Sequence, residues 1–289
     1  MYKIMSPHRL MLISALSLSL FLSACSQDKV AVTADAQPLK FKQQLDLLLA
    51  QFDSKTDVDD IHSIAAVATM LQHPSLSKVK YHAVAGAYGI QDGEYVPAPE
   101  LFDMAFADHW SDAHVDKDKA LAEVLVIVKT TLQQGGDIWI VEAGQSDFSA
   151  ALIQLVKVDA PGINTQQRFH IVQHSEWNQD NTSPEALAYV KAHSDYYKIP
   201  DGNAINNGTA GYKSETAKDW VRALANKNVG NLWQTAKQVA DLYNGQDGRY
   251  NNESIAKGGF DFSDAAELSW IFGVDDAPDV DTFFDKFLL

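Results

Sequence analysis

The sequence places four aspartates, Asp53, Asp57, Asp59 and Asp60, within eight positions. Carboxylates this close repel one another, and burying one of them without a partner is strongly unfavourable. A divalent cation would remove the conflict, and carboxylate oxygens are the ligands that calcium and magnesium prefer. The alternative is a solvated acidic turn whose aspartates cap a helix. Taken alone, the cluster leaves both interpretations open.

Two apolar patterns must position this cluster. Residues 45–52 form a continuous apolar run, which fits either a buried strand or a helix. From Ile61 to Leu71, apolar residues recur at helical spacing. Asp59 and Asp60 would then lie in the first turn, where they complement the positive end of the helix dipole. The aspartates therefore precede and begin a helix.

Strand-like and helical segments alternate along the following chain. Strands are predicted at 78–85, 137–144 and 168–174, with a further candidate at 195–200, and helices at 117–134, at 146–158 with Ser146 or Asp147 as cap, and at 183–193 with Ser183 as cap. This order predicts an α/β fold: a mostly parallel sheet with helices on both faces, followed from about residue 208 by a helical C-terminal part.

Ligands bind parallel sheets of this kind at the carboxyl ends of the strands. The loops that follow Phe52, Ala143 and Gln173 would all open on that edge. The aspartate cluster, which follows Phe52, is therefore expected at the functional edge of the sheet.

The N-terminal region has the layout of an export signal. Lys3 and Arg9 precede an apolar run over 10–25 that is short for a membrane span. Its end, Leu-Ser-Ala-Cys, resembles the bacterial lipobox, which implies removal of residues 1–24 and acylation of Cys25. By the same resemblance, Ser26 implies anchoring at the outer membrane, facing the periplasm. An ordinary signal peptide or an N-terminal anchor helix is the alternative.

Three segments follow from these patterns: a lipoprotein signal peptide at 1–24, a tether without periodicity at 25–40, and a domain at 41–289. Cys25 is the only cysteine, so an intramolecular disulfide is impossible. The formal charge is −15, and loss of Lys3 and Arg9 with the signal would leave −17. Such a chain repels polyanions, which argues against nucleic-acid binding and favours a small neutral ligand or a cation.

A second segment suggests which ligand. The run Ser175–Asn178, followed by Pro184-Glu185-Ala186, resembles a stretch of the nucleoside hydrolases in which A-E-F-N precedes a Pro-Glu-Ala helix start. In that family the acid and the amide of this run hydrogen-bond the ribose, which implies Glu176 and Asn178 as sugar ligands. Trp177 would offer the sugar an apolar face.

The aspartate cluster resembles the same family's D-x-D-x-G-x-D-D motif, with Asp59-Asp60 as the final pair and Asp53 as the first aspartate. The pattern departs at two positions. Lys55 stands where the family has a calcium ligand and presumed base, and Asp57 stands at the glycine. Either Asp57 takes over through a shifted loop, or the metal site is degraded.

Two later segments carry weaker likenesses to this family. Residues 141–152 resemble a strand-to-helix turn, with Gly144 retained and Ser146 or Asp147 near the carbonyl that ligates calcium. Residues 260–273 resemble the segment that supplies the last aspartate ligand, which implies Asp264, with Asp261 second.

The resemblance implies a hydrolase that cleaves the N-glycosidic bond of a ribonucleoside or related glycoside. Calcium, held by Asp53, Asp60 and Asp264, would bind the ribose hydroxyls and the attacking water, with Asp57 or Asp59 as base. The leaving-group acid is unassigned. The nearest histidines are His62, His170 and His174, which at such positions are more often structural.

Two further functions compete with this one. The first is a non-catalytic envelope lipoprotein that binds a sugar or nucleoside on the same scaffold, with the Lys55 ammonium neutralising the aspartates. The second is a cell-surface module that recognises polysaccharide or an envelope protein. Serine-hydrolase, redox and zinc-protease functions are disfavoured because no GxSxG, CxxC or HExxH motif occurs.

Overall fold

The computed structural model describes residues 40–289. The predicted signal peptide, the acylation site at Cys25 and the tether up to residue 39 lie outside these residues. Among the residues described, no helix combines the length and the apolar character needed to cross a membrane.

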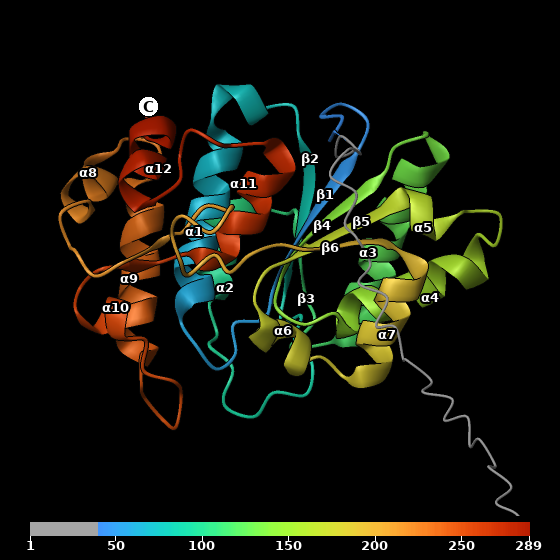
Figure 1. Cartoon of the computed structure of the whole chain (residues 1–289), viewed down its shortest axis with the longest axis horizontal. Helices are drawn as coiled ribbons and strands as arrows, with labels where there is room; N and C mark the ends of the chain where they lie inside the picture. The colour runs from blue at the N-terminus through green and yellow to red at the C-terminus, as the bar shows by residue number, and fades with distance from the viewer. Residues whose placement is uncertain (1–39) are drawn as a thin grey trace, which may run out of the picture. The chain divides into compact units, whose positions relative to one another are not determined.

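Six strands form a central, entirely parallel sheet (Figure 1). In spatial order they are β3 (Trp110–Asp112), β2 (Lys80–Ala85), β1 (Leu47–Phe52), β4 (Ile138–Ala143), β5 (Phe169–Gln173) and β6 (Asp195–Lys198). The predicted α/β class is confirmed. The ambiguous apolar run before the aspartates is strand β1, and all of its residues are buried because it lies near the middle of the sheet.

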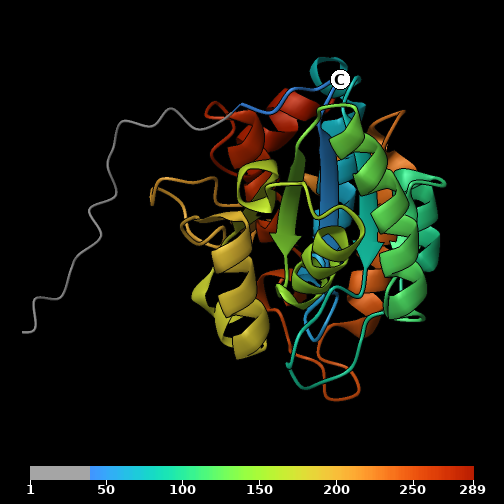
Figure 2. The same ribbon diagram turned by 90° about the vertical axis from the view of Figure 1, so that its right-hand side faces the viewer.

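Side chains of β1 alternate between two cores. Leu48, Ala50 and Phe52 pack into one, and Leu47 and Leu49 into the other. The first core is covered by α1 (Asp59–Gln72), α2 (Pro99–Phe106), α8 (Trp220–Ala225), α9 (Gly230–Tyr243), α11 (Ala266–Phe272) and α12 (Val280–Phe287), and the second by α3 (Lys117–Gln133), α4 (Asp147–Asp159) and α7 (Pro184–His193). Figures 1 and 2 show the sheet between these two layers.

The helical C-terminal part is confirmed and covers α1. The Trp233 indole of α9 donates a hydrogen bond to Thr69 of α1 over 3.0 Å, and the Trp233 ring packs against Phe260, Phe262 and Phe284. Because α1 lies between the sheet and α9, nearly all of its residues are buried. The shorter elements are η1 (Pro74–Leu76), α5 (Thr165–Arg168), α6 (Glu176–Asp180), α10 (Glu253–Ala256), η2 (Ser263–Ala265) and the two-stranded antiparallel pair β7 (Lys213–Ser214) and β8 (Phe260–Asp261).

Ser146 and Ser183 occupy the N-cap positions of α4 and α7, as predicted, but neither side chain makes a capping hydrogen bond. The Ser146 hydroxyl donates instead to the buried Glu142 carboxylate over 2.6 Å, and the Ser183 hydroxyl donates to Asp147. These side chains join α4 to its neighbours rather than closing its own first turn.

The strand order reverses next to β1. The chain runs from β1 to β2 on one side and later returns to β4 on the other, so the loops after β1 and β4 leave the sheet in opposite directions. Such a switch point opens a crevice at the carboxyl edge. Gly144, directly after β4, packs closely against Asp53 at this edge. A Cβ at position 144 would lie 2.6 Å from the Asp53 Cβ.

We therefore expect Gly144→Ala to lower the free energy of unfolding by about 1–3 kcal/mol, because the added methyl group overpacks the crevice floor. Gly162→Ala is the matched control, since a Cβ there meets nothing within 4 Å, and it should change stability by less than about 0.5 kcal/mol. Denaturant unfolding measures both. Equal stability of the two variants would contradict the close approach of Gly144 to Asp53.

Candidate functional site

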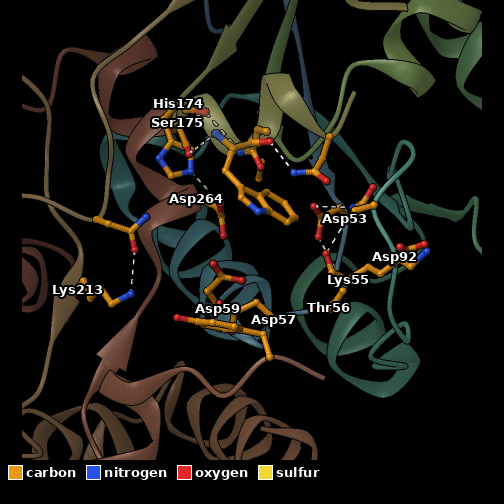
Figure 3. Close-up of a pocket in the computed structure, with 17 residues that line it drawn as sticks. Asp53, Lys55, Thr56, Asp57, Asp59, Asp92, His174, Ser175, Lys213 and Asp264 are labelled. Atoms are coloured by element: carbon orange, nitrogen blue, oxygen red, sulfur yellow. Dashed lines mark hydrogen bonds and ion pairs between the residues drawn. The ribbon is translucent and has the colours of Figure 1, made fainter. Parts of the chain in front are cut away.

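A cavity of about 510 Å³ opens at the switch point (Figure 3). The loops that follow β1 and β5 line it, as predicted for this edge, together with Ala143 at the end of β4 and the later segment around η2. Acidic, amide, aromatic and basic side chains share its wall: Asp53, Lys55, Thr56, Asp57, Asp59, Gln91, Asp92, Ala143, His174, Ser175, Trp177, Asn178, Asn181, Asn203, Lys213, Tyr250 and Asp264.

Asp53 extends directly from the end of β1 and is held by amides. Its Oδ1 accepts the Lys55 backbone N–H over 2.8 Å, and its Oδ2 accepts the side-chain amides of Gln145 over 2.8 Å and Gln91 over 3.2 Å. Burial raises the pKa of Asp53 to about 7, and the nearby Asp264 carboxylate adds to this, although the Lys55 and Gln145 hydrogen bonds oppose it. The amides fix the carboxylate without supplying a positive charge.

The other three aspartates of the cluster have different surroundings. Asp57 accepts its neighbour's backbone N–H over 2.6 Å and the Asn252 amide over 3.3 Å, and Asp59 lies in the first turn of α1. Both line the cavity. Asp60 lies deeper: one oxygen accepts the Ser54 backbone N–H, and the other, Oδ1, is buried without a partner.

Asp264 comes from η2, some two hundred residues farther along the chain. Its Oδ1 accepts a hydrogen bond from His174 Nε2 over 3.1 Å, and its Oδ2 accepts one from the Ser63 hydroxyl over 3.2 Å. The Gly202 backbone nitrogen lies 2.9 Å from His174 Nδ1. Burial lowers the pKa of His174, but the Glu267, Asp201 and Asp264 carboxylates outweigh it and raise that pKa, which favours a positively charged ring beside Asp264. Asp264, which was predicted ahead of Asp261, lines the cavity, and Asp261 does not.

These carboxylates raise one another's pKa values. For Asp59 and Asp60, burial is the largest cause, and the Asp264 and Asp53 carboxylates add to it in both cases. For Asp57 burial is again first and the Asp261 carboxylate second, which brings its pKa to about 7. The cavity therefore holds carboxyl groups that resist being ionised together.

The donor set suits a hard cation, because it consists of carboxylate oxygens that repel one another and includes the unpartnered Asp60 Oδ1. Asp53, Asp59 and Asp264 line the same cavity. Across residues 40–289, however, no three or more His, Cys, Asp or Glu side chains are drawn together closely enough to hold a metal ion. The chemistry of the donors fits calcium, and their present spacing is wider than a coordination sphere.

Some side chains of the segment after β5 face the cavity and others face solvent. Trp177, half exposed at 50%, and the buried Asn178 both line the cavity, as the predicted sugar contacts require. Glu176 does not: its side chain is 83% exposed and pairs with Lys198 over 2.8 Å. The structure therefore places the predicted acidic sugar ligand outside the cavity, because the short helix α6 turns that side chain away from Asn178.

Two lysines reach the cavity, and they differ in their partners. Lys55 Nζ lies 4.6 Å from the centre of the Tyr88 ring and has no carboxylate oxygen within 4 Å in the described chain. Lys213 is the cation that pairs with an acid, because the register of β7 with β8 sets it opposite Asp261, and their side chains meet at 2.8 Å. Lys213 therefore forms an ion pair with an acidic residue of this region, whereas Lys55, the cation expected for the binding alternative, lines the cavity without a direct pair.

Several site residues escape sequence reasoning. Gln91 and Gln145 are ordinary loop glutamines in the sequence, yet both hydrogen-bond Asp53. Lys213 belongs to a two-residue strand that carries no recognisable pattern. Among the candidate histidines only His174 lines the cavity, whereas His62 packs against Trp220 and its pKa is lowered to about 3 by burial.

The turn after β4 contributes to the site through Gln145, and not through its predicted neighbours. Ser146 and Asp147 are occupied with Glu142 and Ser183, and neither lines the cavity. His170 is also remote from the cavity wall, since its ring lies against Trp139 and its Nδ1 faces Asp195 at 2.9 Å.

Comparison with known proteins identifies no relative. No protein-family model matches the chain, and searches of curated proteins and of solved structures find no match. The function must therefore be argued from the cavity itself.

The raised carboxyl pKa values predict how stability depends on pH. A carboxyl whose pKa rises from 3.8 to about 7 on folding keeps a proton that the unfolded chain has released. Without added cations, the free energy of unfolding should therefore fall as the pH rises from about 4 to about 7. Chemical denaturation at a series of pH values measures this slope.

Asp59→Asn should flatten that slope and stabilise the protein at pH 8 by an amount of order 1 kcal/mol, because one of the mutually repelling charges is removed. Asp108→Asn, at a side chain that is 89% exposed, should leave the slope unchanged. A steeper slope in Asp59→Asn would show that the carboxylates do not interact as described.

Proposed function

We propose that this protein is a hydrolase that cleaves the N-glycosidic bond of a ribonucleoside or related glycoside, with a calcium ion activating water, and that it resembles the nucleoside hydrolases in this chemistry. One observation carries the proposal: Asp53 and Asp59 line one cavity with Asp264, which comes from a distant part of the chain, beside Trp177 and Asn178. Acids beside an indole and an amide suit a polyhydroxylated ligand. The proposal includes anchoring to the bacterial outer membrane, facing the periplasm, through Cys25.

In this proposal calcium would polarise the sugar hydroxyls and lower the pKa of the attacking water. Asp53 and Asp264 face the cavity and would hold the ion, and Asp60 would contribute its unpartnered Oδ1. Asp57 or Asp59 would accept the proton of the water. A pKa of about 7 suits Asp57 to that role near neutral pH.

The substrate would be held by groups outside the acidic cluster. Asn178, fixed by a hydrogen bond from the Gln145 amide over 3.5 Å, would bond a sugar hydroxyl, and Trp177 would cover an apolar face of the ligand. His174 would keep Asp264 in place through its Nε2 hydrogen bond. No group in this arrangement is assigned as the acid that protonates the leaving base.

A second candidate function is a non-catalytic lipoprotein that binds a sugar or nucleoside in the same cavity. The ion pair of Lys213 with Asp261 favours it. Burial disfavours the ammonium, but Asp261, together with Asp59 and Asp57, raises the pKa of Lys213 and keeps it charged. This cation partly neutralises the acidic residues without any metal ion.

Calcium dependence separates the two functions. If calcium is held by the carboxylates, millimolar calcium should raise the melting temperature by several degrees and EDTA should reverse the rise, because the ion binds only the folded state. Asp264→Asn should lose most of this rise. Asp92→Asn, at an exposed acid on the same cavity, should keep it. An identical response from both variants would place the ion elsewhere.

Hydrolysis of inosine or uridine by the soluble form from Ser26 to Leu289 tests the enzyme directly. Release of the nucleobase should require calcium. One of the variants Asp57→Asn and Asp59→Asn removes the general base, and that variant should lose about 100-fold or more in turnover. Its partner should lose much less. If the wild type binds ribose yet releases no base at any calcium concentration, the protein is the binding lipoprotein.

A further inference from the structure

A second cavity, of about 310 Å³, lies beside the acidic one, and Lys55 lines both. Its other walls come from the loop after β2, from His114 and from the chain after α9: Tyr88, Gly93, Glu94, Tyr95, Pro97, His114, Tyr243 and Arg249. The function proposed above uses none of these residues. Figure 3 shows Lys55 at the side of the acidic cavity that carries Asp92.

The wall of this second cavity is tied together by specific contacts. Lys55 and Tyr95 form an antiparallel backbone bridge, and the Arg249 guanidinium donates to the Tyr95 carbonyl over 2.7 Å. The Tyr95 ring stacks on His114 with centroids 3.8 Å apart, and the Tyr88 hydroxyl lies 3.1 Å from His114 Nδ1. These contacts hold the loops in place around the cavity.

The charges on this wall are mostly positive and incompletely paired. Arg249 lies over the Tyr243 ring, and its side chain is only 8% exposed. Its Nη1 pairs with the solvent-exposed Asp247 carboxylate at 3.5 Å, while its buried Nε has no hydrogen-bond partner. Lys55 rests on Tyr88 and pairs with no acid among the described residues. Glu94 is the one acidic residue that lines this cavity within residues 40–289, and it is exposed.

A guanidinium whose acidic partner is a solvent-exposed aspartate and an ammonium with no carboxylate within 4 Å among the described residues are groups that can bind a phosphate oxygen. The neighbouring cavity has the opposite charge. We infer that the second cavity is a phosphate subsite, and that the natural ligand is a phosphorylated sugar or nucleotide whose sugar lies in the acidic cavity and whose phosphate passes Lys55 toward Arg249. The inference rests on the proposed function only for the placing of the sugar.

Binding of ribose and of ribose 5-phosphate tests this subsite without any readout of catalysis. The purified protein should bind ribose 5-phosphate at least tenfold more tightly than ribose at low ionic strength, and the preference should weaken with salt. Lys55→Gln should reduce the preference below threefold. Lys157→Gln is the matched control, because that lysine also lies over a tyrosine ring, Tyr189, but on the second helical layer, and it should retain the tenfold preference.

Arg249→Gln, checked for folding by its melting temperature, should lose the preference in the same way. Inorganic phosphate, without added calcium, should raise the melting temperature of the wild type and not that of Lys55→Gln. Equal binding of the two sugars by the wild type, a preference that survives in Lys55→Gln, or no stabilisation by inorganic phosphate would each overturn the subsite.

The proposed function can fail separately from the subsite. A protein that releases no base from nucleosides or nucleotides, yet keeps the Lys55-dependent preference for ribose 5-phosphate, has the phosphate subsite and lacks the hydrolase activity. A protein that hydrolyses inosine and shows no preference for the phosphorylated sugar has the activity and lacks the subsite.

Discussion

Repulsion among buried carboxylates is the constraint on which the site depends. Asp53 is fixed to the end of β1, Asp59 begins α1 and Asp264 is delivered by η2, so folding itself brings the charges to one cavity. The free energy that this requires must come from the two apolar cores that hold β1 and α1 in place. The acidic residues are tolerated because the surrounding fold is stable enough to confine them.

Neutral groups do most of the local compensation. Glutamine amides and backbone N–H groups bond Asp53 and Asp60, whereas Lys213 forms its ion pair with Asp261 and acts on Asp59 and Asp57 only from a greater distance. Hydrogen bonds hold carboxylates in position but remove little of the repulsion between them. The remaining repulsion makes the cavity receptive to a cation, to protons or to ligands rich in hydroxyl groups. The two proposed functions, hydrolase and binding lipoprotein, differ in which of these reduces the repulsion.

The sequence predicts the central part of this arrangement well, because apolar patterns identify β4, β5 and the helices that follow the strands, and chain order then indicates a parallel sheet. The continuous apolar run of β1 fits a strand or a helix equally, and only its place in the sheet decides. It fails where few residues carry the structure. β3 has three residues and β7 has two, too few for a period to show. Glu176 illustrates a different limit: its spacing from Asn178 is visible, but the direction of its side chain depends on how α6 leaves β5.

The two cavities together favour one orientation of a bound ligand, which neither cavity does alone. A ligand with hydroxyl groups at one end and an anion at the other is attracted by Arg249 and Lys55 and repelled by Asp53 and Asp59, so only one orientation satisfies both ends. A neutral sugar receives no such guidance. Lys55 lines both cavities, so it lies between the carboxylates of the first and Arg249 of the second. A cation at this boundary can contact the phosphate of a ligand whose sugar occupies the acidic cavity, which is why the proposed subsite depends on Lys55.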